Sequence, residues 1–134
     1  MSKKSEYKAK NEAYLAAKSQ EEGVKTLTKG ILYEVIKSGN PQGRRPDRNS
    51  VVCVHYTGQL INGHTFDTTR NEGIPAAFHL YEVIEGWQIA LSQMRPGDRW
   101  KIYLPADTAY GSRTDGDIPG NSTLIFDVEL KNIV

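Results

Sequence analysis

The stretch SVVCVHYTGQLINGHTFDT, residues 50–68, contains the pattern that decides the fold. Its first half is rich in β-branched and aromatic residues, which favour an extended chain. Apolar side chains alternate there, and Val52, Val54 and Tyr56 share one face. Residues 50–60 are therefore predicted to form a strand, and the segment that follows decides where its partner runs.

The turn after this strand is marked by Asn62-Gly63, a dipeptide that is a strong signal for a two-residue hairpin turn. The chain is therefore predicted to fold back through residues 64–68 as an antiparallel partner. With this turn at the centre, Asp67 lies opposite Gly58. The register thus predicts an acid on the apolar face of the strand.

The rest of the chain adds further strands and one short helix. Alternating apolar residues predict strands at 31–36, 99–104 and 122–134. Residues 83–94 contain an i, i+3, i+4, i+7 apolar series that begins at Trp87, which predicts an amphipathic helix. No alternation of helices and parallel strands is present. The pattern indicates an α+β domain in which a curved antiparallel sheet of about five strands wraps over the helix.

The N-terminal residues have a different composition. Residues 3–22 are rich in Ala, Lys, Glu and Gln and contain no Gly or Pro, which predicts a helix that is capped at Gly23. Its apolar stripe is thin, so a docking helix, a dimerisation helix and a solvated, frayed extension all stay open. We divide the chain into an N-terminal helical extension, residues 1–24, and a domain, residues 25–134.

Composition and charge narrow the classes of partner. The chain has 134 residues, 38% of them hydrophobic, which suits one globular domain. A net charge of +1, with a short basic cluster at residues 43–48, gives no reason to expect a nucleic-acid partner. No apolar run predicts a membrane span or a signal peptide. The sequence as written suits the cytoplasm, and a removed leader would allow the periplasm or the cell surface.

Reactive side chains form no recognisable metal or nucleophile site. Cys53 is the one cysteine, so neither an internal disulfide nor a cysteine-rich zinc site is expected. Cys53 and His55 share a strand face, but nothing in the surrounding sequence would activate the thiol, and a packing role is favoured. With His64 and His79, the histidines show no metal-ligand spacing. We expect no metal and no cofactor.

Separated motifs resemble one known family. The segments VHYTGQLINGHTFDTT, VIEGWQIAL, TAYG and STLIFDVEL, in this order and spacing, resemble the FKBP family of peptidyl-prolyl cis-trans isomerases, the macrolide-binding immunophilins. The resemblance covers residues 30–134. The residues before it are similar to the bacterial branch that includes the macrophage infectivity potentiators, in which a helix leads into the catalytic domain and longer members dimerise through helical arms.

The resemblance implies a pocket assembled from distant parts of the chain. In the family, the counterpart of Trp87 forms the floor, while the backbone of Ile84 and the hydroxyl of Tyr110 bind the carbonyls that flank the proline. Spacing alone favours a core role for Trp87, Phe78 and Phe126. The family motifs reverse this for Trp87 and leave Phe126 undecided. The implied catalytic residues are Tyr56, Phe66, Asp67 and Tyr110. The implied substrate-binding residues are Phe78, Val83, Ile84, Trp87, Ile118 and Phe126.

Asp67 is the carboxylate that the resemblance places in this pocket. We expect the Tyr56 hydroxyl to donate to the Asp67 carboxylate, which would hold a polar edge toward a twisting amide carbonyl without proton transfer. The predicted register puts Phe66 on the opposite face, so the strand must bulge or bend near residues 65–67 if both residues line the cleft. The simpler alternative is that Asp67 satisfies hydrogen bonds at a strand end.

The implied function is acceleration of rotation about Xaa-Pro bonds in protein chains, which assists folding. A chaperone or regulatory module that binds hydrophobic or proline-containing segments with little turnover is the alternative. The implied partners are proline-containing polypeptides, macrolides such as tacrolimus or rapamycin, and a second copy of the chain through the N-terminal helix. Where many eukaryotic members carry another aromatic residue, this chain has Ala76, so that wall of the pocket should be more open.

Overall fold

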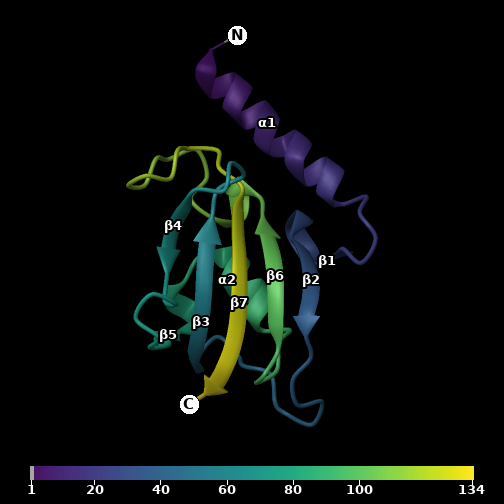
Figure 1. Cartoon of the computed structure of the whole chain (residues 1–134), viewed down its shortest axis with the longest axis vertical. Coiled ribbons are helices and arrows are strands. Elements are labelled where there is room, and N and C mark those ends of the chain that lie inside the picture. Colours follow the sequence, from purple (N-terminus) through teal and green to yellow (C-terminus); the bar gives the residue numbers. More distant parts are fainter. Residues whose placement is uncertain (1) are drawn as a thin grey trace.

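The computed structural model describes residues 2–134 and shows one antiparallel sheet with one helix on its inner face and a second helix at one end (Figure 1). The strand order is β1-β2-β6-β7-β3-β4. β5 pairs with the first half of β3, on the same edge that β4 pairs with near the end of β3. The strands are β1 (Lys25–Thr26), β2 (Leu32–Lys37), β3 (Val51–Gln59), β4 (Thr65–Thr68), β5 (Ala76–His79), β6 (Arg99–Leu104) and β7 (Leu124–Ile133). The helices are α1 (Lys3–Lys18) and α2 (Glu85–Leu91).

The predicted α+β class is confirmed, with an antiparallel sheet over one short helix and another helix before it. The sheet has 7 strands rather than about five. Both strands that the sequence pattern missed are short. β1 has 2 residues, and β5 has the sequence AAFH, in which the alanines favour an extended chain only weakly.

The core lies between α2 and the long strands of the sheet, with β3 among them. Burial alternates residue by residue along β3, with Val52 and Val54 completely buried, as the sequence pattern predicts. Trp87 on α2 belongs to the same apolar cluster. A Cβ at Gly86 would lie 2.6 Å from a methyl group of Leu104 in β6, so glycine at this position lets the helix lie close to the sheet.

α2 is shorter than the predicted span of residues 83–94. Ile84 precedes the helix with an extended ψ of 151°, and the helix ends before Ser92. The N–H groups of Gln93 and Met94 then donate to carbonyls one tight turn back. Met94 is completely buried although it lies outside the helix, which explains why apolar periodicity overestimated the helix length.

The hairpin between β3 and β4 does not have the expected two-residue turn. Leu60 N–H donates to the carbonyl of His64 at 2.9 Å, and Gly63 N–H donates to the carbonyl of Leu60 at 3.0 Å. Ile61 therefore joins Asn62 and Gly63 in the loop, and Gly63 takes a left-handed φ of 90°. Taken alone, this longer loop would slide β4 by one residue.

A bulge at Phe66 cancels that slide. Gln59 pairs with Thr65 and Gly58 pairs with Asp67, which leaves Phe66 as the extra residue on β4. The predicted pairing of Gly58 with Asp67 and the predicted bulge are both confirmed. The longer loop and the bulge together bring Asp67 to its predicted register and free Phe66 from the strand's alternation.

α1 packs against the outer face of the sheet. Tyr14 and Leu15 contact a second apolar cluster, separate from the main core, that contains Leu32, Tyr103 and Ile125 from three strands. The ring centroids of Tyr14 and Tyr103 lie 6.4 Å apart. The thin apolar stripe of the helix is therefore a docking face.

Asn11 fixes the helix to the start of β7. Its side chain is 2% exposed, its Oδ1 accepts from the N–H of Thr123 at 2.7 Å, and its Nδ2 donates to the carbonyl of Tyr7 at 2.8 Å. The hydroxyls of Tyr7 and Ser122 lie 2.7 Å apart. Of the alternatives left open by the sequence, a solvated and frayed extension is wrong.

The end of α1 comes earlier than expected. The helix ends at Lys18, because the Ser19 hydroxyl donates back to the carbonyl of Ala16 and the chain continues in turns. Gly23 has a left-handed φ of 85°, so it does reverse the chain, but several residues after the helix. Within residues 2–134, neither helix has the length and apolar content needed to cross a bilayer.

Candidate active site

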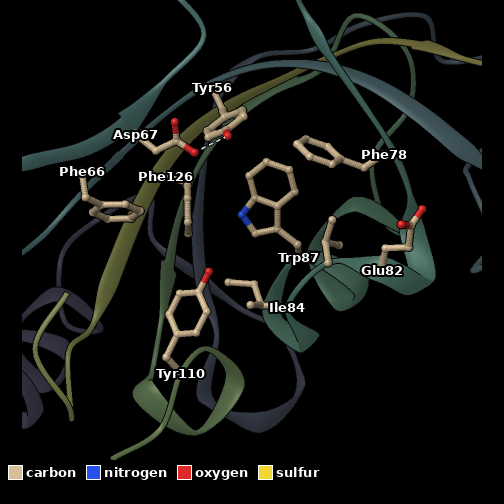
Figure 2. A pocket seen from close by; sticks show the side chains of 10 residues that line it. Tyr56, Phe66, Asp67, Phe78, Glu82, Ile84, Trp87, Tyr110 and Phe126 are labelled. Atoms are coloured by element: carbon tan, nitrogen blue, oxygen red, sulfur yellow. Dashed lines mark hydrogen bonds between the residues drawn. The ribbon is translucent and has the colours of Figure 1, made fainter. Parts of the chain in front are cut away.

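A cavity of about 350 Å³ opens beside the N-terminal end of α2 (Figure 2). Its walls come from β3, β4, β5 and β7, from α2 and the turn before it, and from the loop after β6. All the residues predicted for the site except Ile118 line it. The lining residues are Tyr56, Phe66, Asp67, Phe78, Glu82, Val83, Ile84, Trp87, Tyr110 and Phe126.

Trp87 is the centre of the aromatic wall. Its ring centroid lies 5.0 Å from that of Tyr56, 5.2 Å from that of Phe126 and 5.9 Å from that of Phe78, each pair close to perpendicular. Edge-to-face contacts of this kind stabilise aromatic pairs beyond their buried area. The buried indole Nε1–H donates to no acceptor within residues 2–134. This wall is closely packed and apolar, with one unused donor.

Phe66 reaches the cavity because of the bulge in β4. Its ring meets Phe126 edge to face with centroids 5.6 Å apart. A Cβ at Gly58 would lie 2.6 Å from Phe66 and 2.7 Å from Phe126. Gly58 therefore leaves room for two aromatic rings.

Asp67 is held by Tyr56, as predicted. The Tyr56 hydroxyl donates to Oδ2 of Asp67 at 2.5 Å (Figure 2). Burial, and then the bond to Asp67, raises the pKa of Tyr56 above its usual value, so the hydroxyl stays protonated and keeps donating. The carboxylate is thus fixed at the edge of the aromatic wall.

Two further polar groups lie across the cavity from Asp67. Tyr110 is 39% exposed, and its hydroxyl points inward in Figure 2. Burial, and then the charges of Asp115 and Asp67, raises the pKa of Tyr110, which favours the neutral donor form. The Ile84 N–H donates to no acceptor within residues 2–134, so it is free for a ligand.

The sequence missed Glu82, and Ile118 does not line the cavity. Glu82 lines the cavity, and its Oε1 lies 2.7 Å from His79 Nδ1 and accepts from the His79 N–H at 3.3 Å. The spacing of His79 and Glu82 is that of a capping box, which is the signal that could have pointed to the carboxylate. Ile118 is only 6% exposed and packs into the main core instead of lining the cavity.

A contact between two loops was also missed. His64, beside the hairpin loop, has its Nε2 2.5 Å from Oδ2 of Asp117 in the loop that follows Tyr110. The hydrogen bond from His64 lowers the pKa of the exposed Asp117 below its ordinary value. This contact ties the hairpin to the loop after Tyr110, and no short-range pattern connects residues so far apart in the chain.

Comparison with known proteins identifies the family. A family model described as FKBP-type peptidyl-prolyl cis-trans isomerase matches residues 42–131. The chain belongs to the FKBP family. A second model, described as the domain amino terminal to FKBP-type peptidyl-prolyl isomerase, matches residues 1–35. The FKBP resemblance read from the sequence motifs is confirmed.

Bacterial proteins are among the curated relatives of this chain, in agreement with the resemblance read from the sequence. Peptidyl-prolyl cis-trans isomerase Mip of Coxiella burnetii is 46% identical over 125 residues, which cover 92% of this chain and 54% of that protein. Outer membrane protein MIP of Legionella longbeachae is 42% identical over 132 residues, covering 98% of this chain and 56% of that protein. The chain spans about half the length of these curated relatives.

Solved FKBP structures share the fold. The crystal structure of FkpA from Escherichia coli matches with a TM-score of 0.90 at 38% identity, over 96% of this chain and 60% of that one. A peptidyl-prolyl cis-trans isomerase structure from Pseudomonas syringae matches with a TM-score of 0.90 at 34% identity, over 99% of this chain and 97% of that one. The FKBP likeness therefore extends through both α1 and the sheet.

Proposed function

We propose that this chain accelerates cis-trans rotation about Xaa-Pro bonds in polypeptides. The observation that carries the proposal is the convergence of aromatic side chains from separate elements on one cavity that has few polar groups. No nucleophile is needed for this reaction. A cavity of this kind suits a proline ring and the imide bond that precedes it.

The chemistry follows from the amide bond itself. Rotation about it meets a barrier of about 18–20 kcal/mol, because the C–N bond loses resonance as it twists. A twisted amide has a less polarised carbonyl than a planar one, so an apolar surrounding destabilises the twisted form less than the planar form. Each lowering of the barrier by about 1.4 kcal/mol gives a tenfold faster rotation. The aromatic wall around Trp87 would supply much of this difference.

The polar groups would orient the substrate. The Ile84 N–H and the Tyr110 hydroxyl, which have no acceptor among residues 2–134, are suited to the carbonyls on either side of the proline. The Asp67 carboxylate, held by Tyr56, would face the carbonyl that swings as the imide twists. In this assignment Tyr56, Phe66, Asp67 and Tyr110 act on the rotating bond.

The remaining lining residues would bind the proline-containing segment. This set includes Phe126, which is 5% exposed yet lines the cavity, so it serves both the core and the pocket. Macrolides such as tacrolimus or rapamycin are proposed ligands of the same cavity, since their bulk suits its apolar walls. A division into an extension, residues 1–24, and an isomerase domain, residues 25–134, and a homodimer through α1, remain predictions.

The deciding experiment measures exchange between cis and trans forms of a short Xaa-Pro peptide by NMR, with and without the protein. We expect clear acceleration by the intact chain and a large loss in Asp67→Val and Phe66→Ala. Both variants should still show a cooperative thermal unfolding transition, at a lower temperature than the intact chain. An intact chain that leaves the exchange rate unchanged would eliminate the isomerase proposal and favour a binding module with little turnover.

A further inference from the structure

A second pocket lies at the other end of α2 and shares no lining residue with the first. It is formed by β1, β2, β6, the loop after β2 and the turn between α2 and β6. The loop after β2 lies at the end of the sheet away from α1 in Figure 1. Its volume is about 350 Å³, and its cationic side chains are Lys25, Arg45 and Arg95. None of these three forms an ion pair within residues 2–134.

Both arginines in this pocket are held in place through one nitrogen. Arg45 Nε donates to the carbonyl of Gln93 at 3.2 Å, and Arg95 Nε donates to the carbonyl of Gly43 at 3.0 Å. The Nη groups of both side chains donate to no acceptor among residues 2–134. A guanidinium anchored in this way keeps its remaining donors in a fixed direction, which suits paired hydrogen bonds to an oxyanion.

The one carboxylate in the pocket does not neutralise these arginines. Oδ1 of Asp98 accepts from the Gly39 N–H at 2.6 Å, and Oδ2 accepts from the Arg95 N–H at 2.9 Å, so both oxygens bind backbone amides. A Cβ at Gly39 would lie 2.2 Å from the carbonyl oxygen of Pro96, so the loop after β2 lies directly on the turn before β6. The pocket wall is built before any ligand arrives.

The lining of this pocket carries a net positive charge. It contains Lys25, Arg45 and Arg95 against the single carboxylate of Asp98, although the whole chain has a net charge of only +1. The local field therefore favours an anionic ligand.

The apolar side of the pocket limits what that ligand is. Tyr33 and Trp100 stack on each other with centroids 4.3 Å apart and an interplanar angle of 20°, and Val35 beside them is 41% exposed. Trp100 is only 6% exposed, so its ring offers little free face to a nucleobase. A small inorganic anion would use the guanidinium groups and leave the apolar wall in water.

We propose that this pocket is a binding site for acidic polypeptide segments, in which carboxylates pair with Arg45 and Arg95 and a neighbouring apolar side chain covers Val35 and Tyr33. The site is separate from the isomerase cavity and does not depend on isomerase activity. Its occupant has the chemistry of a Glu- or Asp-rich stretch of a client or partner chain.

The test uses a short, terminally blocked peptide of glutamate and leucine residues without proline, titrated into the full chain and followed by calorimetry and NMR. We expect shifts at Trp100 and Val35 and none at Trp87. Substituting Arg45→Gln together with Arg95→Gln should weaken binding about tenfold or more. The matched control, Arg44→Gln with Arg48→Gln, removes the same charge outside the pocket and should weaken binding far less.

A single variant and a second peptide complete the test of this binding site. Arg45→Gln alone affects an exposed side chain and should weaken binding without altering the unfolding transition. A peptide with lysine in place of glutamate should not bind. Equal losses in the two double variants, binding of sodium phosphate alone, or no binding by the intact chain would each overturn the proposal. The rate of peptide isomerisation, measured in parallel, should stay unchanged in all these variants. Failure of the intact chain to accelerate isomerisation would therefore bear on the cavity around Trp87 and not on this second pocket.

Discussion

The ring of Phe66 lies in the space in front of Gly58, 2.6 Å from where a Cβ of residue 58 would be. Phe126 occupies the other side of the same space at 2.7 Å. We therefore predict that Gly58→Ala displaces both rings, which lowers the isomerisation rate and costs about 1–3 kcal/mol of unfolding free energy, as overpacking generally does. Peptide exchange by NMR and urea denaturation would measure the two effects.

Gly63→Ala is the control for this variant. Gly63 has a φ of 90°, and a Cβ at this position would have no neighbour within 4 Å, so alanine strains the hairpin loop without touching the rings. We expect it to cost about 1–2 kcal/mol of stability while isomerisation persists. Equal loss of activity in the two variants would show that the rings in front of Gly58 are not what matters.

Tyr56 and Asp67 should be energetically coupled. Their hydrogen bond is partly buried, and a bond to a charged group contributes about 1.5–3 kcal/mol. We predict that Tyr56→Phe and Asp67→Asn each lower the isomerisation rate, and that the double variant loses less than the sum of the two. A double-mutant cycle on rate and on stability measures the coupling. Strict additivity would mean that Tyr56 does not position the carboxylate.

How far the sequence predicted this site is best seen in β4. The register of Asp67 followed from a turn signal and was correct, although the loop proved longer and a bulge made up the difference. Apolar periodicity describes regular strands. It therefore indicated that β4 must bulge if Phe66 and Asp67 both line the cavity, but it did not place the ring of Phe66 against Gly58. The aromatic wall around Trp87 came from family motifs, because spacing alone allowed a plain core residue.

The misses have a common physical origin. Ile118 follows the family motif, but the loop that carries it folds back between Asp115 and Ile118 and turns this side chain into the core. The contact of His64 with Asp117 and the docking of Asn11 join residues far apart in the chain. Long-range contacts of this kind depend on loop paths, which local patterns do not specify.

Alkaline pH should destabilise the fold through two tyrosines. Burial, then the bond to Asp67, raises the pKa of Tyr56, and burial, then the bond to Glu34, raises the pKa of Tyr103. An unfolded chain loses these protons near pH 10 (about the ordinary value), whereas the folded chain keeps them. Their contribution to stability is therefore complete below about pH 10 and is lost as pH rises further.

Urea denaturation across this range measures the effect. We expect the free energy of unfolding to fall with pH above about 10, and the slope to become shallower in Tyr103→Phe, which has no proton to lose. The part of the tyrosinate absorbance that comes from Tyr56 and Tyr103 should likewise appear at higher pH in the folded chain than in the urea-unfolded chain. An identical slope in Tyr103→Phe would show that this hydroxyl ionises equally in both states.

Asn11 should decide whether α1 stays on the sheet. Its Oδ1 accepts from the Thr123 N–H, a buried donor at the start of β7. In Asn11→Ala that donor loses its partner, so we predict a loss of about 1–3 kcal/mol and faster amide hydrogen exchange at Thr123. Asn11→Asp keeps the acceptor for the Thr123 N–H, so this amide should stay protected, although a buried carboxylate facing the carbonyl of Tyr7 lowers stability by itself. Equal exchange at Thr123 in Asn11→Ala and the unsubstituted chain would mean that the helix is held by its other contacts, those of Tyr7, Tyr14 and Leu15.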